Sequence, residues 1–396
     1  TDNKVIITVV VEIPGSQGPT ELVPVFIRSV GERRGLRDQT GWSRWKPGRS
    51  CAEKHPYSSG LRTRYNFTRR PNRQIVVSIP IKITRSEFKS KKIVPAAMRF
   101  VDIAGLVKGA STGEGLGNKF LAHIREVDAI AQVVRCFEDG NITHVEGSLD
   151  PLRDIEIINT ELCLADMESV EKRIERVNKL LKTGDKKLPL EKAALEKVLA
   201  GLGEAIPARR LSLTEEELAL LKELHLLTLK PVLYITNVAE DEVAGSKSNA
   251  HVEAVRKYAE QEGAETVAIS AKMEAEIAEL PAEEAQEFLA MTGLSEPGLN
   301  RIIKVGFKLL GLMTYLTAGE TETRAWTIVR GTKAPQAAGK IHTDFERGFI
   351  RAEIVSYADL VACGSKAAAR EKGLVRLEGK EYVMQDGDVV EFRFNV

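Results

Sequence analysis

The groups best suited to chemistry follow an apolar run in the second half of the chain. Residues 232–235 read Val-Leu-Tyr-Ile, and Asn237, Val238 and Glu240 come directly after them. An amide and a carboxylate at the end of a short strand can exchange hydrogen bonds with a purine, whose edge presents both donors and acceptors. Asn237, Val238 and Glu240 are therefore candidate nucleotide-binding residues.

This spacing differs from Asn-Lys-x-Asp, the guanine-reading pattern of P-loop GTP-binding proteins. Glu240 stands where that pattern has Asp, and Val238 stands where it has Lys. A site built on paired donors and acceptors discriminates strongly against a base that leaves them unpaired. The two differences favour ATP, or tolerance of both ATP and GTP. Because Asn-x-x-Glu alone occurs by chance in many loops, it needs support from elsewhere in the chain.

A second short apolar stretch begins at Phe100 and Val101 and ends in an acid, Asp102. Asp102 is followed three positions later by Gly105, which is the first of five glycines in residues 105–117. In P-loop NTPases such an Asp holds Mg²⁺, usually through water, and the Gly amide meets the γ-phosphate. Glycines leave the loop free to order around a phosphate. The alternative interpretation is a Gly-rich surface turn.

A third apolar stretch, residues 267–269, ends in Ser270, Ala271 and Lys272. In the same NTPase class this loop touches the edge of the base and ribose, so Ser270 and Ala271 are candidate nucleotide-binding residues. Open α/β sheets bind ligands at the carboxyl ends of their strands. The three stretches therefore predict one nucleotide site at one edge of a sheet, with Mg²⁺ as its cofactor.

Long segments of the chain are similar to the YchF or Obg-like ATPase family, a branch of the Obg-related TRAFAC P-loop NTPases. The similarity extends from about Lys89 to Val396, and residues 359–365 resemble cyanobacterial or plastid members most. It is carried mainly by residues 102–118, 120–126 and 324–342. The resemblance implies hydrolysis of ATP, and also of GTP, association with the ribosome or ribosomal RNA, and a place in the cytoplasm or plastid stroma.

The water-positioning residue of such an enzyme is expected at His123. P-loop GTPases often use a Gln directly after Asp-x-x-Gly to orient water, but here that position is Leu106, which cannot hydrogen-bond water. The resemblance implies that a His in the following segment takes this role, and His123 matches it. An imidazole can orient a water or accept its proton. The alternative is a polar His on a helix face.

Residues 1–88 do not resemble the family. The phosphate-binding pattern Gly-x-x-x-x-Gly-Lys-Ser/Thr is absent from the sequence, and the nearest string, residues 41–50, has six residues between its glycines. It also carries Arg49 in place of Lys, and Pro47, which has no amide to offer a phosphate. We therefore expect impaired hydrolysis. The alternative function is a catalytically dead ribosome- or RNA-binding protein that acts through other domains.

Charge also separates this segment from the rest. Residues 1–97 hold 19 Lys and Arg against 7 Asp and Glu, a net charge of +12, whereas the remainder carries −11. Such asymmetry, with aromatic residues among the cations, is typical of nucleic-acid binding. A gene-model, splicing or fusion artefact is the competing interpretation. Within the segment, residues 5–11 and 75–83 are expected to form strands.

The sequence offers neither a membrane-spanning segment nor a cysteine pattern typical of zinc sites. No apolar run reaches the roughly 18 residues of a membrane span, so no membrane partner is expected. The four cysteines are far apart, with no Cys-x-x-Cys pair, which predicts reduced thiols and no zinc site.

The fold class predicted is α/β: a P-loop-NTPase-like, mostly parallel sheet, atypical in its first part, with an inserted antiparallel helical arm and a C-terminal β-grasp (TGS) domain. Apolar positions spaced by three and four along residues 155–181 indicate the first arm helix. A turn at residues 183–187 exposes Lys186 and Lys187, which either contact ribosomal RNA or are simply solvated.

The expected domains are 1–88 (atypical), 89–150 with 226–311 (NTPase, of the OBG type), 151–225 (helical arm) and 312–396 (TGS). Strands are expected at 324–330, 349–354, 381–384 and 389–394, and a helix at 356–362.

Overall fold

The structure is a computed structural model that describes residues 6–10, 67–70, 74–79, 90–103, 124–138, 149–244 and 249–395. Three features singled out in the sequence, Gly105, His123 and the string 41–50, lie outside the described residues. Asp102 is described by its backbone alone. None of the helices in the described parts of the chain combines the length and the apolar character that crossing a bilayer needs.

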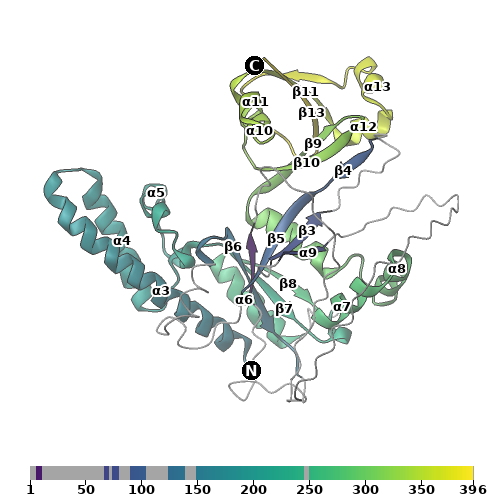
Figure 1. Ribbon diagram of the computed structural model, residues 1–396. Helices are drawn as coiled ribbons and strands as arrows, with labels where there is room; N and C mark the ends of the chain where they lie inside the picture. Colours follow the sequence, from purple (N-terminus) through teal and green to yellow (C-terminus); the bar gives the residue numbers. More distant parts are fainter. Residues whose placement is uncertain are drawn as a thin grey trace, which may run out of the picture.

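The first layer of the fold is a seven-stranded sheet in the order β2-β3-β5-β1-β6-β7-β8 (Figure 1). Strands β2 and β5 to β8 run in one direction, and β1 and β3 run in the opposite direction. The bounds are β1 Ile6–Val10, β2 Phe67–Arg70, β3 Gln74–Ile79, β5 Ala96–Ile103, β6 Ala129–Arg135, β7 Val232–Asn237 and β8 Glu265–Ile269. The predicted α/β class is confirmed. The pairing is parallel from β6 to β8 and antiparallel from β2 to β6, in line with the expectation that the first part of the sheet is atypical.

Both faces of this sheet are buried, which explains the continuous apolar run in β7. Tyr234 packs in one cluster with α3 (Pro151–Leu180) and α6 (Ala250–Glu262). Leu233 and Ile235 pack in another cluster against α9 (Gly298–Leu309). A Cβ at Gly298 would lie 2.5 Å from Cγ2 of Ile269, so α9 can begin this close to β8 only with glycine at that position. Helices α7 (Ala271–Glu279) and α8 (Ala282–Met291) connect β8 to α9.

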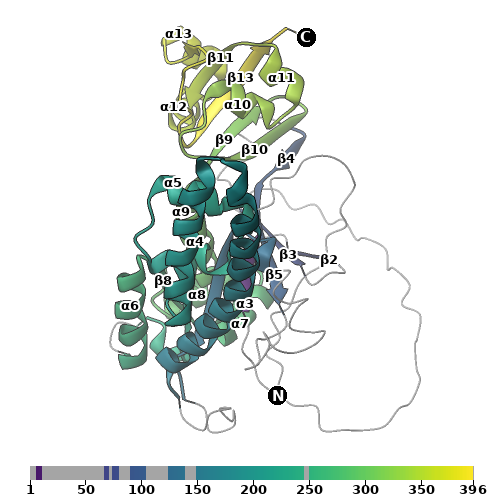
Figure 2. The ribbon, with the colours of Figure 1, turned by 90° about the vertical axis from the view of Figure 1, so that its left-hand side faces the viewer.

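The predicted helical arm is present and projects from the side of the sheet (Figures 1 and 2). Asp150 caps α3 by accepting the N–H of Arg153 at 3.1 Å, and the helix then runs for 30 residues, about 45 Å. Gly184, at φ +80°, reverses the chain into α4 (Lys187–Gly203). The two helices bury Val170, Val177, Leu195 and Val198 between them.

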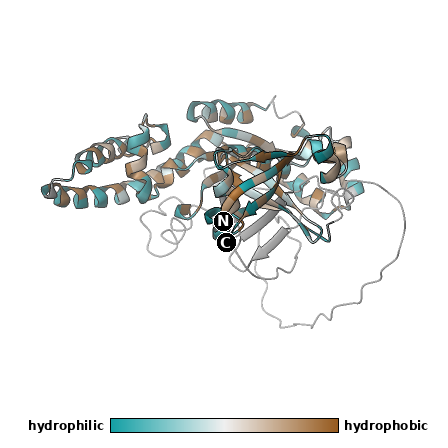
Figure 3. Cartoon of the chain, turned by 90° about the horizontal axis from the view of Figure 1, so that it is seen from above, coloured by the Kyte–Doolittle hydropathy of each residue, from teal (hydrophilic) through white to brown (hydrophobic). Residues whose placement is uncertain are grey.

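Short helices bring the chain back from the arm tip to the sheet. They are η1 Leu181–Thr183, η2 Ala208–Arg210, α5 Glu215–Leu221, η3 Lys222–Leu224 and η4 Leu227–Leu229. Asp166, near the middle of α3, fixes η4 by accepting the N–H groups of Leu227 and Thr228 at 3.0 and 2.7 Å. Seen from above, the arm extends well beyond the rest of the molecule (Figure 3), so most of its surface is open to partners.

A six-stranded sheet, in the order β12-β11-β13-β9-β10-β4, forms the C-terminal domain. Its strands are β4 Lys92–Val94, β9 Leu312–Ala318, β10 Glu322–Val329, β11 Phe349–Ser356, β12 Arg376–Glu378 and β13 Asp388–Phe394. Its helices are α10 Ala334–Gly339, α11 Thr343–Arg347, α12 Tyr357–Cys363 and α13 Lys366–Glu371. Strand β4 comes from far upstream and pairs in parallel with β10.

Two sequence expectations for this domain need correction. The strand predicted at residues 381–384 is wrong: this stretch makes only an isolated bridge between Lys333 and Val383. Its backbone bonds instead hold the start of α10, since Tyr382 accepts the N–H of Ala334 at 2.9 Å. The strand lies earlier, at β12. Strand β9, which was not predicted, occupies a central position in the sheet.

Candidate functional site

The carboxyl ends of β6, β7 and β8 lie side by side at one edge of the seven-stranded sheet. Arg135 pairs with Asn237, and Asn237 pairs with Ile269. Beyond the strands, the N–H of Cys136 donates to the carbonyl of Asn237, and the N–H of Val238 donates to that of Ile269, both at 2.8 Å. The loop after β7 is therefore tied to both neighbouring strands where it leaves the sheet.

The side chain of Asn237 bridges two of the predicted site loops. Its Oδ1 accepts the N–H of Ala271 at 2.9 Å, across 34 positions of sequence. Ser270 caps the same helix, α7, with its Oγ accepting the N–H of Met273 at 3.5 Å. With Oδ1 engaged, Nδ2 is the group that Asn237 can offer to a ligand. The structure thus brings Asn237, Ser270 and Ala271 together, as the sequence led us to expect.

The carboxylate of Glu240 is paired with Lys272. The Lys272 Nζ lies 3.0 Å from Oε1 and 3.0 Å from Oε2 of Glu240, and both side chains are partly open to solvent. Sequence reasoning included Glu240 but not its partner, although Lys272 directly follows Ala271. The pair places a donor, Lys272, and an acceptor, Glu240, near Asn237, and either group can face a polar ligand.

Val238 plays a different part from its neighbours. Its side chain is only 2% exposed and packs in the cluster that lies between the sheet, α3 and α6. Because this side chain faces the core, Val238 can contribute to the candidate site only through its backbone and through the shape that it gives the loop.

Glu242 and Asn249 support the loop from below, and sequence reasoning missed both. Glu242 accepts the N–H of Ala239 at 3.2 Å and the Nδ2 of Asn249 at 3.0 Å. The same Nδ2 donates to the carbonyl of Cys136 at 3.0 Å. Oδ1 of Asn249 caps α6, and this was the available signal, since Asn is a favoured N-cap residue. Burial, and then Glu242, raise the pKa of the Cys136 thiol to about 12.

Strand β5 runs toward the same edge as β6 to β8 but ends at Ile103, level with Gln132 and three residues before the end of β6. Asp102 pairs with Ile7, which in turn pairs with Ala131 on β6. Asp102 is thus three strands from Asn237, about 14 Å across the sheet at about 4.8 Å per strand. It also lies four residues below the level of Arg135 and Asn237. Mg²⁺ takes one or two protein carboxylates and completes its shell with phosphates and waters; for Asp102 the structure describes the backbone position alone.

Strand β1 runs opposite to the strands on either side of it. Its last residue, Val10, pairs with Arg99, the fourth residue of β5, and Val9 pairs with Ala129 at the start of β6. The chain therefore leaves β1 at the edge away from Asn237. In the parts of the chain that the structure describes, no group of three or more His, Cys, Asp or Glu side chains gathers as a metal site.

The fold and the meeting of strand-end loops are those of the P-loop GTPase class. A family model described as "50S ribosome-binding GTPase" matches residues 66–181. The model for the C-terminal domain of YchF GTPases, described as a protein of unknown function, matches residues 312–395. The first match begins upstream of Lys89 and includes β2 and β3.

Individual relatives narrow the class. The "Ribosome-binding ATPase YchF" of Bacillus subtilis is 60% identical over 306 residues, which cover 77% of this chain and 84% of the relative. The protein of the same name from Escherichia coli O157:H7 is 54% identical over 308 residues, 78% of this chain and 84% of its own length. The chain therefore belongs to the YchF family.

Comparison with solved structures supports the same family and fold. The structure of the Schizosaccharomyces pombe YchF GTPase has a TM-score of 0.71 and 40% identity, covering 82% of this chain and 88% of that chain. A GTP-binding protein from Pyrococcus horikoshii OT3, 19% identical with a TM-score of 0.50, shares the fold; the match covers 82% of this chain and 93% of that one.

Proposed function

We propose that this chain binds purine nucleoside triphosphates, preferring ATP or accepting both ATP and GTP, and associates with the ribosome through ribosomal RNA. The observation that carries the nucleotide assignment is the bond from Ala271 N–H to Asn237 Oδ1, which joins two site loops beside the Glu240–Lys272 pair. The ribosomal assignment is supported by relatives named ribosome-binding ATPases.

Each candidate residue has a distinct role in this proposal. The base lies against Asn237, the backbone of Val238, and Glu240, and its other edge meets Ser270 and Ala271. Asp102 would hold Mg²⁺ through water, and Mg²⁺ would neutralise phosphate charge when bound. From the resemblance, Gly105 would offer its amide to the γ-phosphate and His123 would orient the attacking water.

We further propose that this chain hydrolyses ATP poorly. A P-loop presents a row of backbone amides, a helix N-terminus and a Lys to the triphosphate, and the sequence contains no such pattern. The direction of β1 supports this view: a phosphate loop would have to follow a strand that ends at the Asn237 edge, and β1 ends at the opposite edge. A catalytically dead ribosome- or RNA-binding protein is thus the second candidate.

Two measurements on the full 396-residue chain test these proposals. Fluorescent adenine and guanine nucleotides are titrated with Mg²⁺, and phosphate release is followed in parallel. We expect measurable purine binding with little turnover. Robust Mg²⁺-dependent ATP hydrolysis that His123→Ala abolishes would contradict the poor-hydrolysis proposal. If the chain binds no purine nucleotide but still co-sediments with ribosomes, the nucleotide proposal is wrong and the second candidate, a catalytically dead ribosome- or RNA-binding protein, is supported.

A further inference from the structure

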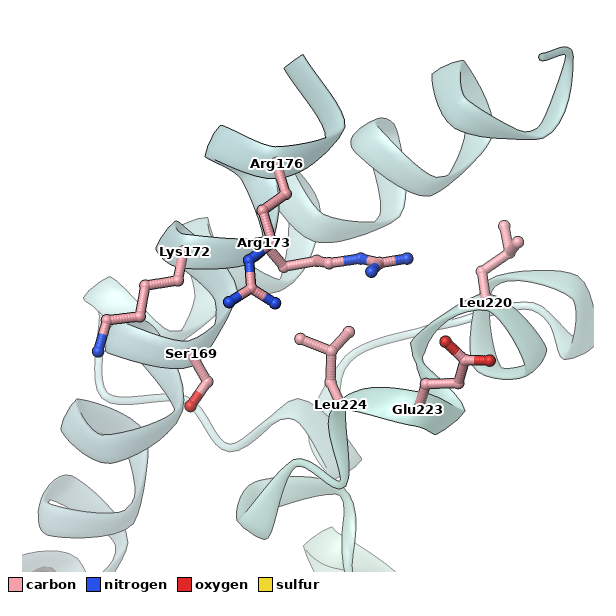
Figure 4. A pocket seen from close by; sticks show the side chains of 7 residues that line it. All are labelled: Ser169, Lys172, Arg173, Arg176, Leu220, Glu223 and Leu224. Carbon is pink, nitrogen blue, oxygen red and sulfur yellow. The ribbon is translucent and has the colours of Figure 1, made fainter. Parts of the chain in front are cut away.

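The charged groups that line a small pocket beside the helical arm are balanced. Lys172 and Arg173 each pair with a glutamate of the arm, and the lining is left with one cation, Arg176, and one acid, Glu223 (Figure 4). This pocket therefore has no excess charge with which to select a ligand. Near the nucleotide site, by contrast, a buried carboxylate accepts its hydrogen bonds from backbone N–H groups instead of from a cation.

That carboxylate belongs to Glu274, in the first turn of α7. The residue is 9% exposed, and its own N–H donates to the carbonyl of Ser270 at 2.9 Å. Its two side-chain oxygens accept backbone N–H groups of another helix, α9: that of Gly298 at 2.6 Å and that of Leu299 at 3.2 Å. Pro297, directly before α9, makes no side-chain cap to these groups. Glu274 therefore caps α9 in its place.

The start of α9 also touches the end of the strand that precedes α7. A Cβ at Gly298 would lie 2.5 Å from Cγ2 of Ile269 and 2.8 Å from Oε1 of Glu274, so glycine allows α9 to approach both. The carbonyl of Ile269 accepts the N–H of Val238 at 2.8 Å. Arg301 of α9 donates to a second carbonyl of β8, also at 2.8 Å. Helix α9 is thus fixed where the two site loops, after β7 and after β8, leave the sheet.

Glu274 joins α7 to a helix that is itself firmly packed. Ile302 and Ile303 of α9 are 5% and 4% exposed and lie in one cluster with strands β5 to β8. Burial raises the pKa of Glu274, and its two N–H donors and the charge of Arg301 act in the opposite direction. A carboxylate that accepts two N–H groups at once is held in one orientation. The start of α7 is therefore tied, through Glu274, to the face of the sheet that α9 covers.

We propose that Glu274 is a positioning residue for recognition of the base, and this inference rests on the proposed purine binding. Glu274 acts through Ala271, whose N–H donates to Asn237 Oδ1 at 2.9 Å. It also acts through Lys272, which pairs with Glu240. Groups that are already held in place bind a ligand more tightly, because ordering them on binding costs free energy. Glu274 should therefore sharpen the choice of base more than it strengthens contacts to the triphosphate.

Competition of unlabelled ATP or UTP against a fluorescent adenine nucleotide, on the full chain, tests the proposal, because UTP carries the same triphosphate on a smaller base. Wild-type protein should prefer ATP. Glu274→Gln keeps the shape of the side chain but can accept only one of the two N–H groups, so it should lower the ATP-to-UTP affinity ratio about threefold. Glu276→Gln is the matched control: it removes an exposed carboxylate from the same helix and should leave the ratio unchanged.

A second variant and a second measurement make the test independent of any one change. Gly298→Ala should also lower the ratio, and should add little to Glu274→Gln, because both changes loosen the same contact. Hydrogen exchange followed by mass spectrometry needs no nucleotide. Glu274→Gln should speed exchange in residues 269–273 about threefold, and Glu276→Gln should not. Thermal unfolding checks that each variant is folded; if Glu274→Gln is not, Gly298→Ala decides.

The contrary outcomes are distinguishable. If Glu274→Gln weakens ATP and UTP by the same factor, or changes neither, Glu274 does not position the base site. Faster exchange with an unchanged ratio also contradicts the proposal, because it shows that the cap only stabilises the fold. A wild-type chain that binds ATP and UTP equally contradicts the proposed purine binding itself, whatever the variants do, and the positioning role is then wrong as well.

Discussion

Arg209 and Glu262 form a buried ion pair that joins the helical arm to the nucleotide-binding sheet. Nη2 and Nε of Arg209 lie 3.1 and 3.2 Å from Oε2 of Glu262, whose side chain has no exposed surface. The hydroxyl of Tyr234 donates to the same oxygen at 2.9 Å, and Arg209 also donates to Asn159 Oδ1 at 2.9 Å. The Glu262 carboxylate of α6 therefore contacts η2 and β7 directly, and Arg209 links it to α3.

We expect Arg209→Met to lower the free energy of unfolding by about 3 kcal/mol, because it leaves the buried Glu262 carboxylate with only the hydroxyl of Tyr234 and, 4.0 Å away, Arg210. Urea unfolding of the full chain measures this. The control is Lys304→Met, which breaks an exposed pair with Glu296 and should cost no more than about 1 kcal/mol. Equal losses in the two variants would show that the Arg209–Glu262 pair contributes no more than a surface pair.

Asn237→Ala removes the acceptor that holds the N-terminus of α7 to the end of β7. We expect purine nucleotide affinity to fall about tenfold, because a positioning bond and the Nδ2 donor are lost together. Titration with a fluorescent adenine nucleotide measures the change. Gln261→Ala, which removes an exposed amide from α6, should leave affinity unchanged. An Asn237→Ala protein that binds as tightly as wild type would place the nucleotide elsewhere.

Base choice gives a third prediction. The wild-type chain should prefer ATP or bind both purines, and Glu240→Asp with Val238→Lys should move the preference toward GTP. Because Val238 is buried, Glu240→Asp alone is measured as well, with thermal unfolding as a check on folding. A tenfold preference for GTP in the wild-type chain, about 1.4 kcal/mol, would contradict the assignment of Glu240 as a residue that disfavours guanine.

The thiols of Cys136 and Cys163 should resist alkylation in the folded protein. Both are buried, and desolvation raises the pKa of each to about 12. At pH 8 only about one thiol in ten thousand is then a thiolate, the reactive form. Among the three cysteines that the structure describes, iodoacetamide labelling followed by mass spectrometry should modify the half-buried Cys363 first and the other two only after unfolding in urea. Rapid native labelling of Cys136 would contradict its placement in the core.

Glu274 should make stability depend on pH. It accepts the N–H groups of Gly298 and Leu299 at 2.6 and 3.2 Å, yet burial dominates and raises its pKa above the ordinary 4.5. The folded state thus holds the proton more tightly than the unfolded state. Stability should therefore fall as pH rises from about 4.5 through the raised value. Urea unfolding across this range, for wild type and Glu274→Gln, measures the effect; parallel pH profiles would rule it out.

Much of the site could be predicted because local sequence encodes it. An apolar run followed by Asn237, and another followed by Ser270 and Ala271, mark two strand ends, and neighbouring parallel strands bring such ends together. The Glu240–Lys272 pair and the support from Asn249 could not be predicted this way. They join residues that are distant in sequence, and only the packing of β7, β8 and α6 sets their distances.

The errors in the C-terminal domain have a similar origin. Residues 381–384 alternate like a strand, but Tyr382 turns its hydroxyl toward the buried Asp388 at 2.9 Å, and the local backbone serves α10. Strand β4 carries no sequence signal of its partner, because β10 lies more than 200 positions away. The domain division and the roles of Gly105, Asp102 and His123 stay predictions.

The pairing of β4 with β10 has a consequence for synthesis of the chain. Lys92 pairs with Glu322, and Ser90 donates to the carbonyl of Gly319 at 2.5 Å. The edge of the C-terminal sheet therefore forms between two segments that are about 230 positions apart in the sequence. At about 5–20 residues per second, β4 waits roughly 10–50 s after leaving the ribosome before its partner exists. During that interval the seven-stranded sheet can assemble, but a nascent chain that stalls before Glu322 keeps one strand unpaired and open to the wrong neighbour.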